Sequence, residues 1–287
     1  MSDTDHASVR TTMLRPASTG QSYLMQANAR SDSADGPSPT GSTANEAAFS
    51  ARVALGGAAW LGPVPAATLD RLADLAVLHR VPSGSTLFEQ AETPAFAQVL
   101  VSGSVALLGV NGTAETLIEL VRPIDLLLPA AVLSRRPYLA RARVLEDAHL
   151  VLIQADAFRD AVATDHALCL AVLACQAAQF RRQIKLAKNL KLRSAEERVG
   201  CYLLGLVRAA TQDAPARLSM EKRLIAWQLG MTRETFSRIL GGMERYGLRI
   251  VGDTVAVVDA AALQARFRLD PQIDGAEPII PFPPRRH

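Results

Sequence analysis

The chain has 287 residues, of which 49% are hydrophobic, 21% charged and 5% aromatic, with 3 cysteines and a formal net charge of +3. A typical domain has about 100–200 residues, so this length predicts one large or two ordinary domains, and the apolar fraction excludes a wholly disordered chain. The charge is unevenly distributed: residues 176–249 carry 15 Lys and Arg against 6 Asp and Glu, whereas the rest of the chain is net acidic. A basic region of this kind predicts a polyanion as its partner.

The cysteines and the apolar segments indicate the compartment. Cys169, Cys175 and Cys201 are odd in number and form no Cys-x-x-Cys pair, which is typical of reduced thiols. No run of about 20 apolar residues occurs. We therefore expect a cytoplasmic protein without a membrane partner.

The first half of the chain divides into a polar tail and a β-rich domain. Residues 1–47 are rich in Ser, Thr, Asp and Gly without helical or strand periodicity, which predicts a disordered tail. Residues 48–163 are expected to form an effector domain, because short runs with β-branched residues alternate there with turn signals, as in a barrel or jelly roll. The Asn111-Gly112 pair between two apolar runs predicts a hairpin. The expected strands are Leu75–Val81, Ser85–Phe88, Gln98–Val101, Ser104–Val110, Thr116–Arg122, Leu139–Val144 and His149–Gln154.

A helical period follows, from Ala155 to about Leu192. Apolar residues spaced alternately by three and four predict a dimerisation helix over residues 164–192. The seam would consist of Leu170, Leu173, Ala177, Phe180, Ile184 and Ala187. The alternative is a helix that packs only on its own barrel.

Residues 193–269 predict a winged helix-turn-helix domain. Helices are expected over Ser194–Ala210, Glu221–Leu229 and Arg233–Tyr246, followed by a small hairpin around Gly252-Asp253. Residues 270–287 are rich in proline and should form an extended or loose tail. The fold class expected for the whole chain is α+β.

The segment from Ala226 to Arg238 carries the functional signal. Ala226 is small where two helices must cross, Gly230 can supply the positive φ of a tight turn, and Thr232 can cap the second helix. Outward-facing polar residues remain at the start of that helix, where a recognition helix enters the major groove: Thr232, Arg233, Glu234, Ser237 and Arg238. The alternative is a solvated polar face with an incidental ion pair.

The hydrogen bonds that these side chains can form with base edges favour DNA as the partner. Arg238 can donate two bonds to guanine, and Glu234 can accept one from a cytosine amino group. Ser237 can contact a thymine methyl or a phosphate, and Arg233 can read a base or hold a phosphate.

The stretch Leu229–Arg238 resembles the recognition element of the Crp/Fnr superfamily of bacterial transcription regulators, and its Glu-x-x-Ser-Arg matches the fumarate-nitrate branch. Leu192–Val199 resembles the family's hinge, and the resemblance extends over about Leu55 to Arg268. It implies a homodimer with a cyclic-nucleotide-binding-like jelly roll, reading a TTGAT-like palindrome through Glu234, Ser237 and Arg238. Such an activator is expected to contact double-stranded DNA and RNA polymerase.

The resemblance leaves the effector open. Cyclic-nucleotide-binding members use a Gly-Glu pair and an Arg-Ser or Arg-Thr pair, but Leu128-Pro129 stands at the first position, so cyclic AMP in the usual mode is disfavoured. Arg141 or Arg143 could meet an anion, or could be solvated barrel arginines. An iron–sulfur centre held by an N-terminal cysteine cluster is excluded, because no cysteine precedes Cys169.

Haem stays open as a cofactor. Tyr246–Asp253 resembles the nitric-oxide-responsive subgroup, and His79, His149 and His166 are the imidazoles of the expected folded part. An alternative function is a haem- or cyclic-(di)nucleotide-dependent sensor that acts mainly through protein–protein contacts. An enzyme is disfavoured, because neither a metal-binding cluster nor a nucleophile triad is found.

Overall fold

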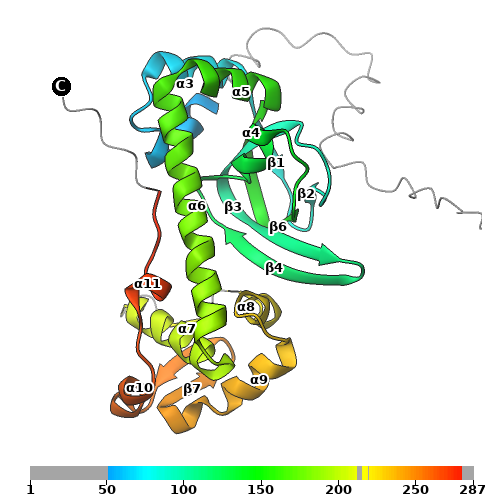
Figure 1. Ribbon diagram of the computed structural model, residues 1–287. Coiled ribbons are helices and arrows are strands. Elements are labelled where there is room, and N and C mark those ends of the chain that lie inside the picture. Colours follow the sequence, from blue (N-terminus) through cyan, green and yellow to red (C-terminus); the bar gives the residue numbers. More distant parts are fainter. Residues whose placement is uncertain (1–50, 212–214, 219, 280–287) are drawn as a thin grey trace, which may run out of the picture.

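The computed structural model describes residues 51–211, 215–218 and 220–279 (Figure 1). The predicted tail over residues 1–47 lies outside the described residues. A β-rich domain and a mainly helical domain lie at the two ends of one long helix, α6 (His166–Leu192). This arrangement confirms the predicted fold class.

A short helical segment precedes the sheet and packs against α6. Residues 51–56 are helical and are followed by η1 (Ala59–Leu61) and α3 (Ala66–Asp74). Trp60 and Leu61 are buried in one apolar core with Leu168 and Val172 of α6. The N-terminal end of α6 is therefore fixed to the β-rich domain.

The β-rich domain is one antiparallel six-stranded sheet in the order β1-β6-β3-β4, with β2 paired to β6 and β5 to β3. Asn111 pairs with Ala114 across Gly112, which confirms the predicted hairpin. The strands are β1 (Ala76–Val81), β2 (Thr86–Phe88), β3 (Phe96–Asn111), β4 (Ala114–Val121), β5 (Asp125–Leu126) and β6 (Arg141–Gln154).

Two of the predicted strand breaks are wrong. The runs Gln98–Val101 and Ser104–Val110 belong to the single strand β3, and the last two runs belong to β6. Gly103 has φ +84°, and a Cβ there would lie 2.5 Å from the carbonyl oxygen of Asp147. The glycine lets β3 cross β6 closely at a register shift, so it bends the strand rather than ending it.

The predicted helical region after the sheet is two helices, α5 (Ala155–Thr164) and α6. Asp165 caps α6 by accepting from the Leu168 N–H at 3.0 Å. Within the described residues no single helix is long and apolar enough to cross a membrane. Only α5 and α6 taken together have the necessary length and composition, and the two helices are bent by 113° relative to each other. A short helix that the sequence did not indicate, α4 (Pro129–Ser134), precedes β6.

The C-terminal domain has the predicted winged helix-turn-helix elements. They are α7 (Ala195–Ala209), α8 (Lys222–Gln228), α9 (Arg233–Gly241), η2 (Met243–Tyr246), β7 (Leu248–Val251), β8 (Thr254–Val257) and α10 (Ala260–Arg266). The wing turns at Gly252, φ +65°, as predicted. The expected helix Arg233–Tyr246 is wrong in its second half, because α9 ends at the Gly241-Gly242 pair and a separate 3-10 turn follows.

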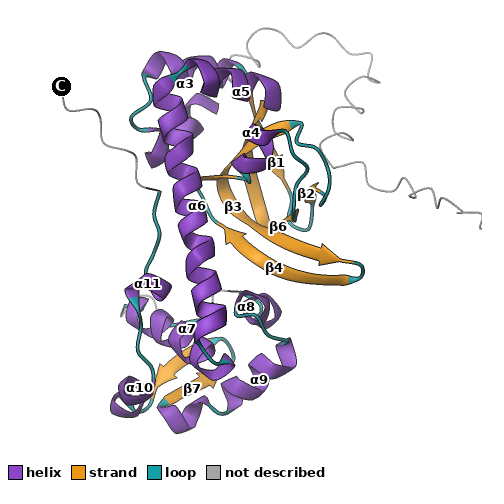
Figure 2. Ribbon diagram, viewed as in Figure 1, coloured by secondary structure: helices purple, strands orange, loops and turns teal. Residues whose placement is uncertain are grey.

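The segment after α10 runs back along α6 towards the β-rich domain (Figure 2). It contains α11 (Pro271–Asp274), capped by Asp270, which accepts from Gln272 N–H at 2.8 Å. Arg193 of the hinge forms an ion pair with Asp274 at 2.6 Å. The expectation of an extended or loose tail is therefore wrong for α11. Residues 275–279 form neither helix nor strand, but Glu277 ties them to α6.

Candidate nucleic-acid interface

The turn between α8 and α9 is fixed by local chemistry. Gly230 has φ +64°, and Met231 N–H donates to the Ala226 carbonyl oxygen at 2.9 Å. Thr232 Oγ1 accepts from Thr235 N–H at 3.2 Å and so caps α9. Ala226 is fully buried between the helices. The predicted conformational roles of Ala226, Gly230 and Thr232 are confirmed.

The apolar side of α9 packs into the core of the domain, and its other side faces solvent. Phe236 and Leu240 are buried with Ile225 and Leu229 of the preceding helix and turn. The five predicted recognition residues are all exposed: Thr232, Arg233, Glu234, Ser237 and Arg238. The fold therefore gathers them on one accessible surface at the first turns of α9.

The charges on this surface are available to a ligand. Arg233 and Arg238 form no ion pair with any residue in the described part of the chain, whereas Arg245 pairs with Glu196 and Arg249 with Glu244. Backbone N–H bonding at the helix start, the Thr232 hydroxyl and the Arg233 charge hold the pKa of Glu234 below its usual range. Glu234 is thus ionised at neutral pH and can accept hydrogen bonds.

Residues behind the surface hold it in place, and the sequence did not single them out. Arg198 of α7 donates from Nε to the Leu229 carbonyl oxygen at 2.7 Å. Glu196 accepts from Tyr246 at 2.9 Å and from Arg266 at 3.0 Å, joining α7 to η2 and α10. The only signal in the sequence was the resemblance of Leu192–Val199 to a hinge, which gave these side chains no role.

The first helix of the motif also contacts the β-rich domain. Trp227 of α8 packs on Ala106, Leu108 and Leu117 of β3 and β4, which are buried. The Arg223 guanidinium lies 5.0 Å from the Trp227 ring centroid. The helix-turn-helix is therefore docked on the outer face of the sheet.

The predicted effector residues are occupied by contacts within the domain. Arg141 donates to Glu89 at 2.6 Å and also pairs with Glu115, and Arg143 lies 3.2 Å from Glu115. Tyr138 stacks on Phe88 with ring centroids 3.7 Å apart, and both rings are buried. Leu128 precedes Pro129 at the start of α4.

The imidazoles and thiols of the described residues do not gather into a centre. His79 lies in β1, His149 bonds through Nδ1 to Ser102 at 2.9 Å, and His166 begins α6. Among the described residues no group of three or more His, Cys, Asp and Glu could hold a metal ion. Cys169 is exposed, while Cys201 is buried and Cys175 is buried beside Asp125, so that burial above all raises the pKa of the Cys175 thiol.

Most of the predicted dimer seam is open to solvent. Leu173, Phe180 and Ile184 are 52%, 66% and 47% exposed, and Ala177 between them is exposed as well. Leu170 and Ala187, at the two ends, are partly exposed. Large apolar side chains at helical spacing are costly in water, so the exposure is in keeping with the prediction, which no partner chain tests.

Comparison with known families follows the same division of the chain. A cyclic nucleotide-binding domain matches residues 78–165, and a Crp-like helix-turn-helix domain matches residues 197–266. No curated protein matches the chain.

Several solved structures share the fold at low identity. FixK2 from Bradyrhizobium japonicum is 20% identical with a TM-score of 0.56, and the match covers 68% of this chain and 98% of that one. The c-di-GMP responsive global regulator CLP of Xanthomonas campestris is 17% identical with a TM-score of 0.57, covering 68% and 100%. A transcriptional regulator of the CRP family from Thermus thermophilus is 20% identical with a TM-score of 0.54, covering 70% and 100%.

Proposed function

We propose that the chain is a transcription regulator of the Crp/Fnr type, with a cyclic nucleotide-binding domain and a Crp-like helix-turn-helix domain, and that it reads a TTGAT-like palindrome as a homodimer. The observation that carries the proposal is the surface at the start of α9, where Arg233, Glu234, Ser237 and Arg238 are exposed together. Arg238 donates two bonds to guanine and Glu234 accepts one from cytosine. Ser237 and Arg233 contact a thymine or the neighbouring phosphates.

The two-fold arrangement follows from the central helix. A partner helix packed on Leu173, Ala177, Phe180 and Ile184 covers apolar surface that is otherwise exposed. The two copies of α9 are then related by two-fold symmetry and can meet half-sites about one helical turn apart. The palindrome and the seam therefore support the same assembly.

The proposed effector is not cyclic AMP bound in the mode that is usual for the family. Arg141 and Arg143 are engaged by Glu89 and Glu115, and Tyr138 stacks on Phe88 near the same strands. An anion would have to displace these carboxylates before reaching either guanidinium. A structural neighbour is described as c-di-GMP responsive, but the engaged arginines give that ligand no support here.

The test is a gel-shift titration of the full chain on a duplex with TTGAT and ATCAA half-sites separated by four base pairs. Arg238→Ala should weaken binding by about 1–3 kcal/mol and relax selectivity at one base pair of each half-site. Arg136→Ala removes the same charge from an exposed position in the β-rich domain and should bind like the unaltered protein. Equal affinity and selectivity for both variants would falsify the recognition role.

A further inference from the structure

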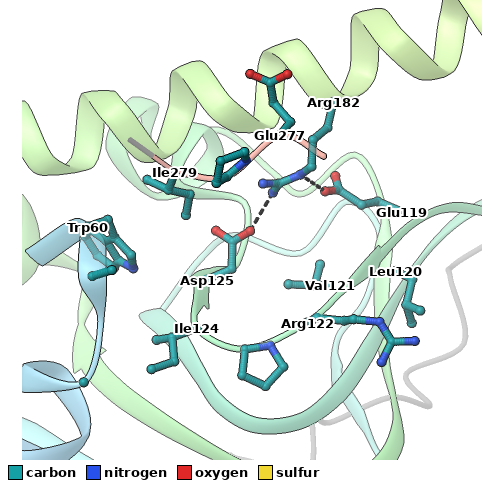
Figure 3. Close-up of a pocket in the computed structure, with 14 residues that line it drawn as sticks. Trp60, Glu119, Leu120, Val121, Arg122, Ile124, Asp125, Arg182, Glu277 and Ile279 are labelled. Carbon is teal, nitrogen blue, oxygen red and sulfur yellow. Dashed lines mark hydrogen bonds and ion pairs between the residues drawn. The ribbon is translucent and has the colours of Figure 1, made fainter. Parts of the chain in front are cut away.

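A cavity of about 500 Å³ lies between η1, the β4–β5 turn, α6 and the C-terminal segment (Figure 3). Its size falls in the range of small-molecule sites, which is about 300–1,000 Å³. Its apolar walls include Val121, Pro123, Ile124 and Ile279. None of Leu128, Arg141 and Arg143, the positions related to the usual nucleotide site, lines this cavity.

The charged groups around the cavity neutralise one another. Arg182 of α6 donates to Asp125 at 2.5 Å and to Glu119 at 2.7 Å (Figure 3). Asp125 is 6% exposed and also accepts from Gln179 at 3.0 Å. The exposed Arg122 lies at the rim, where Figure 3 shows its guanidinium turned away from Trp60. An ionic ligand would have to break one of these pairs, whereas an uncharged ligand would not.

One buried donor faces the cavity without a partner. Trp60 is 2% exposed, and its Nε1 has no hydrogen-bond partner among the residues that the structure describes. Figure 3 shows the nitrogen on the edge of the ring turned towards Asp125 and Ile124. A buried N–H without an acceptor costs about 1–3 kcal/mol, so a ligand that brings an acceptor gains this energy.

The roof of the cavity belongs to the segment that follows the DNA-binding domain. Ile279 packs against the core that contains Trp60. Glu277 pairs with Lys185 at 2.6 Å and with Arg181, which turns its carboxylate to α6 and away from the cavity. Further back, Asp274 pairs with Arg193 at the hinge. Residues 270–279 thus connect the cavity with the start of the helix-turn-helix domain.

We propose that this cavity binds a small, uncharged and mostly apolar molecule whose hydrogen-bond acceptor meets Trp60 Nε1, and that the C-terminal segment transmits its binding to the DNA-binding domain. The inference rests on the proposed function only for the effect of the ligand on DNA binding, because binding of the ligand in the cavity can be tested without DNA. It places the signal outside the positions that the family uses for cyclic nucleotides.

Binding is tested by ¹⁹F NMR of the full chain labelled with 5-fluorotryptophan, which has two resonances because the chain has 2 Trp. The probe is 2-octanone, an alkyl chain with one uncharged acceptor, and the comparison is octanoate, a charged molecule of similar size. We expect 2-octanone to shift the Trp60 resonance saturably, and octanoate to bind more than about tenfold more weakly, because its charge would be buried unpaired. No saturable shift, or equal binding of the two probes, overturns the site.

Two variants test the contributions of the Trp60 N–H donor and of Ile279 separately. Trp60→Phe keeps an apolar ring and removes the N–H, so calorimetric titration with 2-octanone should show about a fivefold loss of affinity. Ile279→Asp places a charge in the roof and should weaken binding more. Leu139→Asp makes the same kind of change at an exposed leucine elsewhere and should bind like the unaltered protein. Unchanged affinity in Trp60→Phe and Ile279→Asp rejects the assigned contacts.

The coupling is tested with DNA. Saturating 2-octanone should change the DNA affinity of the unaltered protein about threefold or more. Asp274→Asn, which loses the ion pair with Arg193, should bind the probe but lose this change. Probe binding without any effect on DNA rejects the transmission. If the protein binds 2-octanone but shows no DNA selectivity in the gel-shift assay, the proposed function is rejected and the ligand site is retained.

Discussion

The Arg198 side chain joins Leu229 to Arg193: its Nε donates to the Leu229 carbonyl oxygen at 2.7 Å and its Nη1 to the Arg193 carbonyl oxygen at 2.8 Å. Leu229 is the C-cap residue directly after α8, and Arg193 is the C-cap residue directly after α6. One guanidinium therefore satisfies free carbonyl groups at two helix ends and fixes the recognition turn relative to the central helix.

Replacing Arg198 by Met should lower the free energy of unfolding by about 1–3 kcal/mol, because two partly buried carbonyl groups lose a charged donor while the apolar stem is retained. Urea denaturation followed by far-UV circular dichroism measures the change. Arg217→Met removes an exposed arginine paired with Asp253 on the wing and should stay within about 0.5 kcal/mol of the unaltered protein. Similar losses in the two variants would contradict the special place of Arg198.

Gly230 should tolerate no side chain. At φ +64° an alanine is strained, and its Cβ would lie 2.5 Å from Leu190 Cδ2 of α6. Gly230→Ala should therefore cost more than about 1 kcal/mol in thermal or urea denaturation.

A second substitution separates the cost of the contact with Leu190 from the cost of the positive φ at residue 230. Leu190→Ala in the Gly230→Ala background removes the clash but leaves the left-handed backbone, so stability should be recovered in part. Full recovery would mean that sterics alone fix the glycine, and no recovery would mean that φ alone does.

Trp227→Ala should release the helix-turn-helix from the sheet. The substitution uncovers Leu108 and Leu117, which are 1% and 4% exposed, and leaves α8 without its anchor. We expect faster amide hydrogen exchange in β4 and α8, and easier proteolysis at the hinge. Arg223→Met keeps the indole and removes only the cation above it, so its exchange pattern should match that of the unaltered protein; matching patterns for both variants would exclude the docking contact.

The C-terminal segment should be held by ionised carboxylates over the whole neutral range. The Arg181 and Lys185 side chains lower the pKa of Glu277 to about 2, and the bond from Arg193 holds the pKa of Asp274 below its usual range. A lowered pKa in the folded state stabilises it above the ordinary carboxyl pKa of 4.5, and this stabilisation is lost as the pH falls from there towards about 2.

Hydrogen exchange of residues 270–279, corrected for the intrinsic rate at each pH, measures this loss. Protection should be constant around neutrality and fall below about pH 4.5. Glu277→Gln cannot form the ion pairs, so its protection should be weaker at neutral pH and change less with acid. Protection lost already near neutrality would contradict the assigned pairs.

The recognition motif could be predicted from the sequence because its determinants are local. Gly230, Thr232 and the polar residues after them act within a few positions of one another, and the same is true of Asn111-Gly112 and Gly252-Asp253. Gly103 misled the strand assignment, because a glycine that ends a strand and one that permits a close crossing look alike until the partner strand is known.

Contacts between distant parts of the chain could not be predicted from local sequence patterns. Nothing near Trp227 indicates that it packs on Leu108, and the prolines of the C-terminal segment gave no sign that Glu277 would meet Lys185. Such pairs depend on how the domains are placed around α6, which no local pattern records.

The exposed seam on α6 has a consequence for how occupancy of a DNA site responds to the amount of protein. Phe180 is 66% exposed in the single chain, so in the proposed homodimer it is covered only when two chains associate. Where the chain concentration is far below the dissociation constant of the proposed dimer, the concentration of dimer rises with the square of the chain concentration. A twofold change in expression should then give about a fourfold change in bound operator.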